Sequence, residues 1–272
     1  MKLLLVLVIL VCRELIVEEL RLILTQPLRQ WRDRILQYKQ GKAISVDAVL
    51  ALIVVTPALI LSLLLVLASS STFGLWTYLL ILAVLVPIFI DRRLPSILLS
   101  YRQQWSDAAM VDEPELQLKQ ARLQLVTVCL QEVFTPLFWF LLLDTMGVVV
   151  ILIYYGLRLS AEQVDVTEVA ERAKSLMRFF DWLPSRLLAL SFALVGQFVE
   201  TWRYWLDNIR NFDLSVVEFV DVAAEKAVPL EHGQVLTPTL PMALVRMLAA
   251  YESLCYRSMF IWVVLFALHV VL

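Results

Sequence analysis

Long apolar runs separated by polar stretches dominate the chain. Residues 46–68 (VDAVLALIVVTPALILSLLLVLA) reach the length of about 20 residues that a helix needs to cross a bilayer. Residues 75–90 (LWTYLLILAVLVPIFI) form a second apolar run, and the short SSSTFG stretch between the two predicts a helical hairpin. Residues 1–17 and 258–272 are also apolar, and we interpret them as a first and a fourth span. No small-x-small cleavage site follows the first, so we expect it to be retained.

A further apolar run, residues 135–157 (TPLFWFLLLDTMGVVVILIYYGL), is interrupted at Asp144–Gly147. It is either one broken span or a re-entrant helical hairpin, since a charge at mid-depth must face protein or water. A single span here would place the many Arg and Lys residues of segment 158–257 outside. The excess of basic residues expected in cytoplasmic loops therefore favours re-entry.

Two stretches, residues 101–132 and 161–241, have the spacing of amphipathic helices rather than of spans. Apolar residues recur at i, i+3, i+4 and i+7 between Val166 and Phe180, which predicts a helix. In FFDWLPSRLLALSFALVG, Asp181 is a typical capping residue and Pro184 would fall in the first turn, which predicts a new helix beginning at Asp181. We assign these stretches to a cytoplasmic layer of helices.

The patterns together predict an all-α, polytopic integral membrane protein with about four spans, built as one membrane domain over residues 1–272. No period-two alternation indicates a strand. Composition agrees: 61% of the residues are hydrophobic and 18% are charged, against roughly 45–50% and about 25% in soluble domains. The net charge of −2 gives no sign of nucleic-acid binding. Three dispersed cysteines and two histidines predict no metal site.

Three polar features could carry function. The run Asp112-Glu113-Pro114-Glu115 could hold a hard cation such as Mg²⁺, or its acids could simply stabilise a helix N-terminus. Asp144 could line a polar pocket or mark the tip of a re-entrant turn. The candidate residues for a polar pocket or ligand site are Asp112, Glu113, Glu115, Asp144, Arg158, Asp181 and Arg186.

Arg186 belongs to the third feature, the segment DWLPSR at residues 181–186. Its guanidinium fork suits a phosphate or a carboxylate. The alternative is that the segment is a helix cap followed by an arginine at the membrane interface.

Three blocks of the chain carry a family resemblance. PLFWFLL (136–142), with the break at Gly147 and IYYGLR (153–158) after it, resembles a block of the AmpE and CobD/CbiB family. The stretch at 179–196 is similar to that family's D-[WY]-[LIV]-P-x-R-L signature, and the acidic run at 112–115 resembles a segment upstream. The blocks occur in the family's order. The resemblance marks Pro136, Gly147, Trp182 and Pro184 as signature positions.

The family has two branches. One is adenosylcobinamide-phosphate synthase, which depends on ATP and Mg²⁺ and has an E-N-T-x-D-G run before P-L-F. Here CLQEVFT (129–135) stands in that place, and RLSAE (158–162) stands where the synthase has an N-T-L-D-S run. An Asn, a Thr and an Asp that the synthase would use for substrate or metal are therefore absent. The resemblance therefore implies the AmpE branch: a multi-pass protein of the bacterial inner membrane, linked to β-lactamase induction and peptidoglycan recycling.

For that branch we expect no catalytic residues and no cofactor. The expected partners are the lipid bilayer and either cell-wall recycling proteins or a muropeptide. Two alternatives stay open. The first is the synthase, with Mg²⁺ and ATP near the acidic run, Asp181 and Arg186. The second is a ligand-binding or transporter-like protein with a site at a broken helix.

Overall fold

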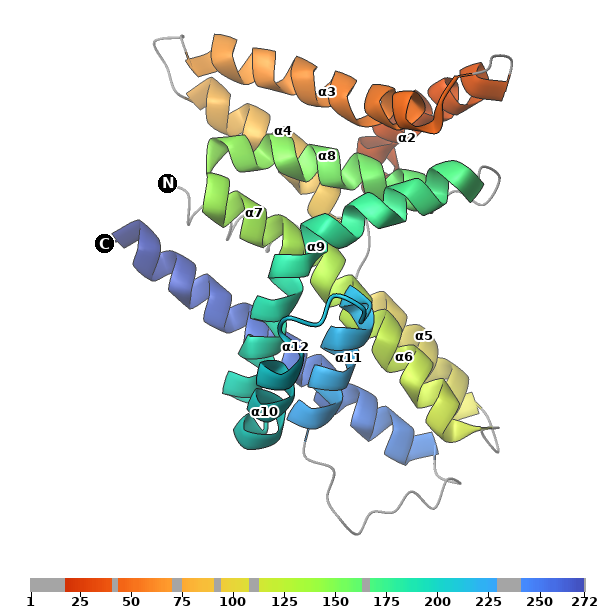
Figure 1. Ribbon diagram of the computed structural model, residues 1–272, viewed down its shortest axis with the longest axis vertical. Helices are drawn as coiled ribbons and strands as arrows, with labels where there is room; N and C mark the ends of the chain where they lie inside the picture. The colour runs from red at the N-terminus through yellow and green to blue at the C-terminus, as the bar shows by residue number, and fades with distance from the viewer. Residues whose placement is uncertain are drawn as a thin grey trace. The chain divides into compact units, whose positions relative to one another are not determined.

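The computed structural model describes residues 18–40, 44–69, 75–90, 94–107, 113–162, 167–228 and 241–271. Within these ranges every regular element is a helix (Figure 1). Three of the described helical stretches are long and apolar enough to cross a membrane: Val46–Ala68, Pro114–Leu143 and Ala243–Leu265. The protein is thus an all-α membrane protein, as the sequence predicts. The first predicted span, residues 1–17, lies outside the described residues.

The chain forms two compact units, each assembled from two separate segments. Unit 1 comprises Met1–Asp91 and Pro136–Phe180, and unit 2 comprises Arg92–Thr135 and Asp181–Leu272. The sequence analysis expects one membrane domain over the whole chain. That the two units act as one membrane domain stays a prediction.

Unit 1 is organised around the packing of α3 (Val46–Ser69) against α8 (Thr145–Ala161). Ile53 and Val54 from α3 are buried with Tyr154 and Leu157 from α8. Helices α2 (Glu18–Gln40) and α4 (Leu75–Ile90) pack onto this pair, and the first half of α9 (Thr167–Val195) adds further core residues. Leucines such as Leu59 on the outer face of α3 are exposed, as expected of a helix whose outer face meets lipid.

The helical chain of unit 1 breaks at Asp144, between α7 (Thr135–Leu143) and α8. Asp144 adopts φ 54° and ψ −128° and is exposed. Its carbonyl accepts a hydrogen bond from the N–H of Gly147 at 2.8 Å, which closes a tight turn. A Cβ at Gly147 would lie 2.5 Å from the carbonyl oxygen of Trp139, so only glycine permits this close approach. Re-entry of this segment into a bilayer stays a prediction.

Unit 2 packs α6 (Pro114–Val128), α11 (Val216–Ala227) and α12 (Pro241–Val271) around a shared core that includes Leu125, Phe219 and Leu248. Helix α5 (Leu94–Asp107) lies against α6 and α12, and α10 (Phe198–Asn208) lies against α11. The second half of α9 adds further residues to the same core.

Helix α6 continues through a π-helical turn, η1 (Cys129–Phe134), into α7. The sequence analysis places residues 101–132 in an amphipathic layer apart from the apolar run that follows. The structure instead joins Pro114 to Leu143 as one stretch long enough to span. The π-helical turn ends at Phe134, two residues before Pro136, and a proline cannot donate a helical hydrogen bond.

The prediction that a new helix begins at Asp181 is wrong. Helix α9 runs without interruption from Thr167 to Val195, with Pro184 in its interior. The Asp181 side chain does not cap a helix: its carboxylate accepts hydrogen bonds from Thr135 Oγ1 at 2.8 Å and from Gln131 Nε2 at 3.3 Å. The capping pattern was therefore a local signal that a long-range contact overrides.

Candidate functional site

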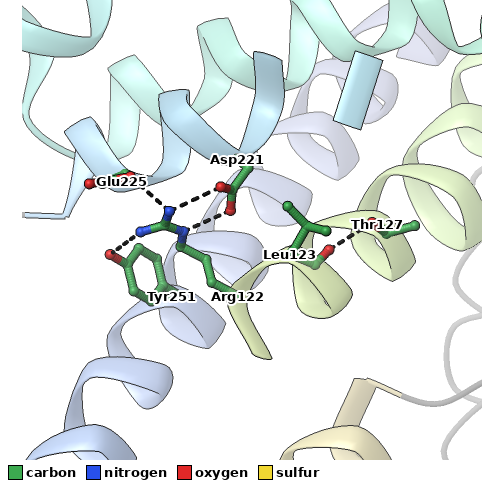
Figure 2. Close-up of polar contacts among 6 residues, drawn as sticks. All are labelled: Arg122, Leu123, Thr127, Asp221, Glu225 and Tyr251. Carbon is green, nitrogen blue, oxygen red and sulfur yellow. Dashed lines mark hydrogen bonds and ion pairs between the residues drawn. The ribbon is translucent and has the colours of Figure 1, made fainter. Parts of the chain in front are cut away.

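A buried arginine holds three helices of unit 2 together. The Arg122 guanidinium, on α6, donates two hydrogen bonds to the Asp221 carboxylate on α11, at 2.7 and 3.0 Å. Its Nη2 also donates to Glu225 Oε2 at 2.7 Å, and its Nη1 donates to the hydroxyl of Tyr251, on α12, at 3.3 Å. Figure 2 shows Asp221 and Glu225 of α11 and Tyr251 of α12 pointing toward Arg122. We refer to Arg122, Asp221, Glu225 and Tyr251 as the Arg122 cluster.

The side chains of the cluster differ in their exposure to solvent. The side chains of Arg122 and Asp221 are 8% and 3% exposed, whereas that of Glu225 is 47% exposed. A bidentate arginine–carboxylate pair is geometrically specific and strong, and burying it is tolerated because each charge is neutralised by its partner. Glu225 therefore presents the side of the network that a ligand could reach.

A hollow of about 690 Å³ opens beside the cluster. Four carboxylates line it, but only two basic side chains, so its lining carries a formal excess of negative charge. Such a lining favours a ligand that brings an ammonium or another hydrogen-bond donor. The charged lining residues are Glu115, Lys119, Arg122, Glu218, Asp221 and Glu225.

The predicted acidic run contributes one residue to this hollow. Glu115 is exposed and lines it. Glu113 precedes α6 with φ 47° and is exposed, and Asp112 lies outside the described residues. Among the residues that the structure describes, no group of three or more His, Cys, Asp or Glu side chains is placed to hold a metal ion.

Asp181 forms a second polar cluster, buried in unit 2. Only 2% of Asp181 is exposed, and its partner Thr135 is completely buried. Its other partner, Gln131, lies in the π-helical turn. Single π-helical turns inside α-helices are rare and occur frequently at functional sites. The CLQEVFT stretch, which lacks the polar run of the synthase branch, thus contains both residues that bind Asp181.

Arg186 is buried inside the protein. The interpretation of Arg186 as an arginine at the membrane interface is therefore wrong. Only 2% of the residue is exposed. The guanidinium lies 5.0 Å from the ring centre of Trp182 and 4.3 Å from that of Phe219. Its Nη2 donates to the carbonyl of Asn211 at 3.0 Å, and its Nη1 donates to Ser185 Oγ. Burial lowers the pKa of Arg186 from its usual value. Anion binding by Arg186 stays a prediction.

The remaining described candidates, Arg158 and Asp144, belong to unit 1. Arg158 is buried on α8, 5.2 Å from the ring centre of Tyr155 and 4.0 Å from the Glu162 carboxylate. Asp144 is at the exposed break described above. Within unit 2, Glu115 lines the hollow, whereas Asp181 and Arg186 each form separate buried contacts.

The four signature positions have structural surroundings. Pro136 and Pro184 are buried, and Gly147 closes the turn at the helix break. Trp182 stacks on Phe212 with ring centres 5.2 Å apart.

Sequence reasoning missed the Arg122 cluster. The signal that could have found part of it is the i, i+4 spacing of Asp221 and Glu225, which puts two carboxylates on one face of a helix. Their partner stands 99 residues away along the chain, and no local pattern marks it.

Comparison with known proteins gives one family match. A family model described as regulatory signalling modulator protein AmpE matches residues 105–265, which is well over half of the chain and contains the whole Arg122 cluster. No curated protein matches at a significant level. The same comparison with solved structures also finds no match. Kinship with the CobD/CbiB branch stays a prediction.

Proposed function

Because the chain belongs to the AmpE family, we propose that it is a regulatory component of the bacterial inner membrane, linked to β-lactamase induction and peptidoglycan recycling. The observation that carries this proposal is the match to a regulatory signalling family over residues 105–265. We further propose that it crosses the membrane several times, since three described stretches are long and apolar enough to do so.

A second observation favours regulation over synthase chemistry. The two charged residues of the family signature form internal hydrogen bonds: Asp181 with Thr135 and Gln131, and Arg186 with Asn211 and Ser185. Groups committed to such buried bonds stabilise the fold. The polar side chains that a ligand can reach instead line the hollow beside the Arg122 cluster.

We propose this hollow as the place where a signal is received. A muropeptide fits its chemistry in one respect, since a free amino group on the stem peptide would complement the surplus of carboxylates. Contact with a cell-wall recycling protein is the other form that the signal could take.

The test is induction of β-lactamase in a bacterium with an inducible enzyme. The host lacks the native gene and carries the wild-type chain, the double variant Glu115→Gln/Glu225→Gln, or the matched control Glu171→Gln. Both target residues are exposed at the hollow, so the fold should persist. Glu171 is exposed in unit 1 and pairs only locally, with Lys174.

We expect deletion of the native gene to change the β-lactamase activity measured after a sub-inhibitory β-lactam. The wild-type chain and the control variant should restore the original activity. The double variant should restore it poorly. Unchanged induction on deletion would contradict the proposal. Thermal unfolding of the detergent-solubilised protein provides a second reading, because a ligand bound only by the folded state raises its stability. Stabilisation by a purified muropeptide supports the proposal. Stabilisation by ATP–Mg²⁺ alone, with product formed from a corrinoid, supports the synthase.

A further inference from the structure

Helix α10 carries a stripe of apolar side chains that are exposed in the structure. Phe198, Val199 and Leu206 are 49%, 63% and 51% exposed. Trp202 lies among them and stacks on Phe198, with ring centres 5.5 Å apart and planes nearly parallel. At 3.6 residues per turn, these four positions share one face of the helix.

One flank of α10, beside the stripe, is anchored to protein. Thr201 is completely buried, and the ring of Tyr204 packs against Phe219 on α11 at 5.6 Å. Trp205 donates its indole N–H to the carbonyl of Arg186 at 2.8 Å. These contacts fix the rotation of α10 about its axis, so the stripe is held outward rather than exposed by chance.

Charged residues on α10 are ordered around the stripe. Arg203, four residues after Val199, is exposed at the stripe's edge, and Arg210 is exposed in the turn that follows the helix. The acids Glu200 and Asp207 are seven residues apart and share the face most distant from Trp202. From one side of the helix to the other the order is therefore apolar, basic, acidic.

We propose that α10 lies in the headgroup region of a bilayer that contains anionic phospholipid. The stripe inserts among the upper acyl chains, Arg203 meets the phosphate groups, and Glu200 and Asp207 face water. An apolar stripe alone could equally contact another protein. The basic border with the acids turned away matches the order of acyl chain, phosphate and water, which is the arrangement of interfacial helices. Tryptophan on the stripe suits the same depth.

The experiment uses spin labels on the full chain in proteoliposomes of phosphatidylcholine with or without phosphatidylglycerol. The three native cysteines are replaced by alanine, and one new cysteine is placed on the stripe (Val199→Cys) or on the acidic face (Asp207→Cys) as the matched control. Leu206→Cys gives an independent reading of the stripe if one variant folds poorly. Collisions of each label with oxygen, which concentrates in lipid, are compared with collisions with a water-soluble nickel chelate.

We expect a several-fold higher ratio of oxygen to nickel collisions at both stripe positions than at position 207. Phosphatidylglycerol should raise that ratio, and Arg203→Gln should remove the increase. Equal nickel access at positions 199 and 207 would place the stripe in water and overturn the proposal. Exclusion of both reagents from the stripe would also overturn it, because protein, such as a second copy of the chain, would then cover α10.

Discussion

Trp139 donates its indole N–H to the carbonyl oxygen of Phe180 at 3.3 Å. Phe180 stands four residues before Pro184, so its carbonyl is the one that the missing N–H of that proline leaves without a helical partner. A side chain thus replaces a backbone donor, which explains how α9 continues through a proline that the sequence pattern places at a helix start.

We predict that Trp139→Phe lowers the free energy of unfolding by about 1–2 kcal/mol, because a partly buried carbonyl then lacks its donor. The cost should shrink by at least about 0.5 kcal/mol in a Pro184→Ala background, where the alanine N–H can donate to Phe180. Unfolding of the four proteins of this double-mutant cycle in mild detergent gives the coupling. Additive effects would show that the indole does not serve this carbonyl.

Gly147 should tolerate no side chain. Gly147→Ala would place a Cβ 2.5 Å from the carbonyl oxygen of Trp139 and 2.8 Å from the Cα of Phe140, both backbone atoms that can move only with the helix. We expect a loss of about 2–4 kcal/mol in unfolding free energy, as in other strained substitutions. Gly156→Ala is the matched control on the same helix. Its Cβ would meet Val54 at an ordinary 3.4 Å, so its effect should be small, and similar losses for both variants would refute the argument.

The two acids that bind Arg122 should differ in their effect on stability. Asp221→Asn leaves a buried guanidinium without its bidentate partner and should cost about 3–5 kcal/mol. Glu225 is half exposed, so Glu225→Gln should cost less than about 1 kcal/mol. Denaturant unfolding of both variants, followed by circular dichroism, checks the difference. If Glu225→Gln proved the more damaging change, the division of the cluster into a buried and an accessible part would be wrong.

Tyr204 should make stability fall at alkaline pH. Burial of its ring, followed by the charge of Glu218, raises the pKa of Tyr204 to about 12. An unfolded tyrosine has a pKa of about 10. Between these values the unfolded chain has lost the proton and the folded chain has kept it. The contribution of Tyr204 is therefore complete below pH 10 and is lost as pH rises towards 12.

Tyr204→Phe should remove this dependence. Its hydroxyl has no hydrogen-bond partner among the described residues, so the variant should be about as stable as wild type at neutral pH. The difference in melting temperature between wild type and variant, followed from neutral pH to about 12, should then favour the variant increasingly above about pH 10. A constant difference over that range would contradict the assigned pKa shift.

Much of the fold was predictable because it is encoded locally. The apolar runs at 46–68 and 75–90 coincide with α3 and α4, since a helix of apolar residues satisfies its own backbone whatever surrounds it. The interruption at Asp144 coincides with the gap between α7 and α8, because one charge and one glycine change the local backbone preference.

The tertiary structure alone decided how the polar residues are used. Asp181 has the sequence pattern of a helix cap, yet it binds Thr135 and Gln131 about fifty residues earlier. Arg122 has no distinctive sequence context, yet it joins α6, α11 and α12. The sequence by itself determined which segments are helical and apolar, because these are sums over neighbouring residues. Which charge meets which depends on contacts between segments distant in the chain, and those exist only once the helices have packed.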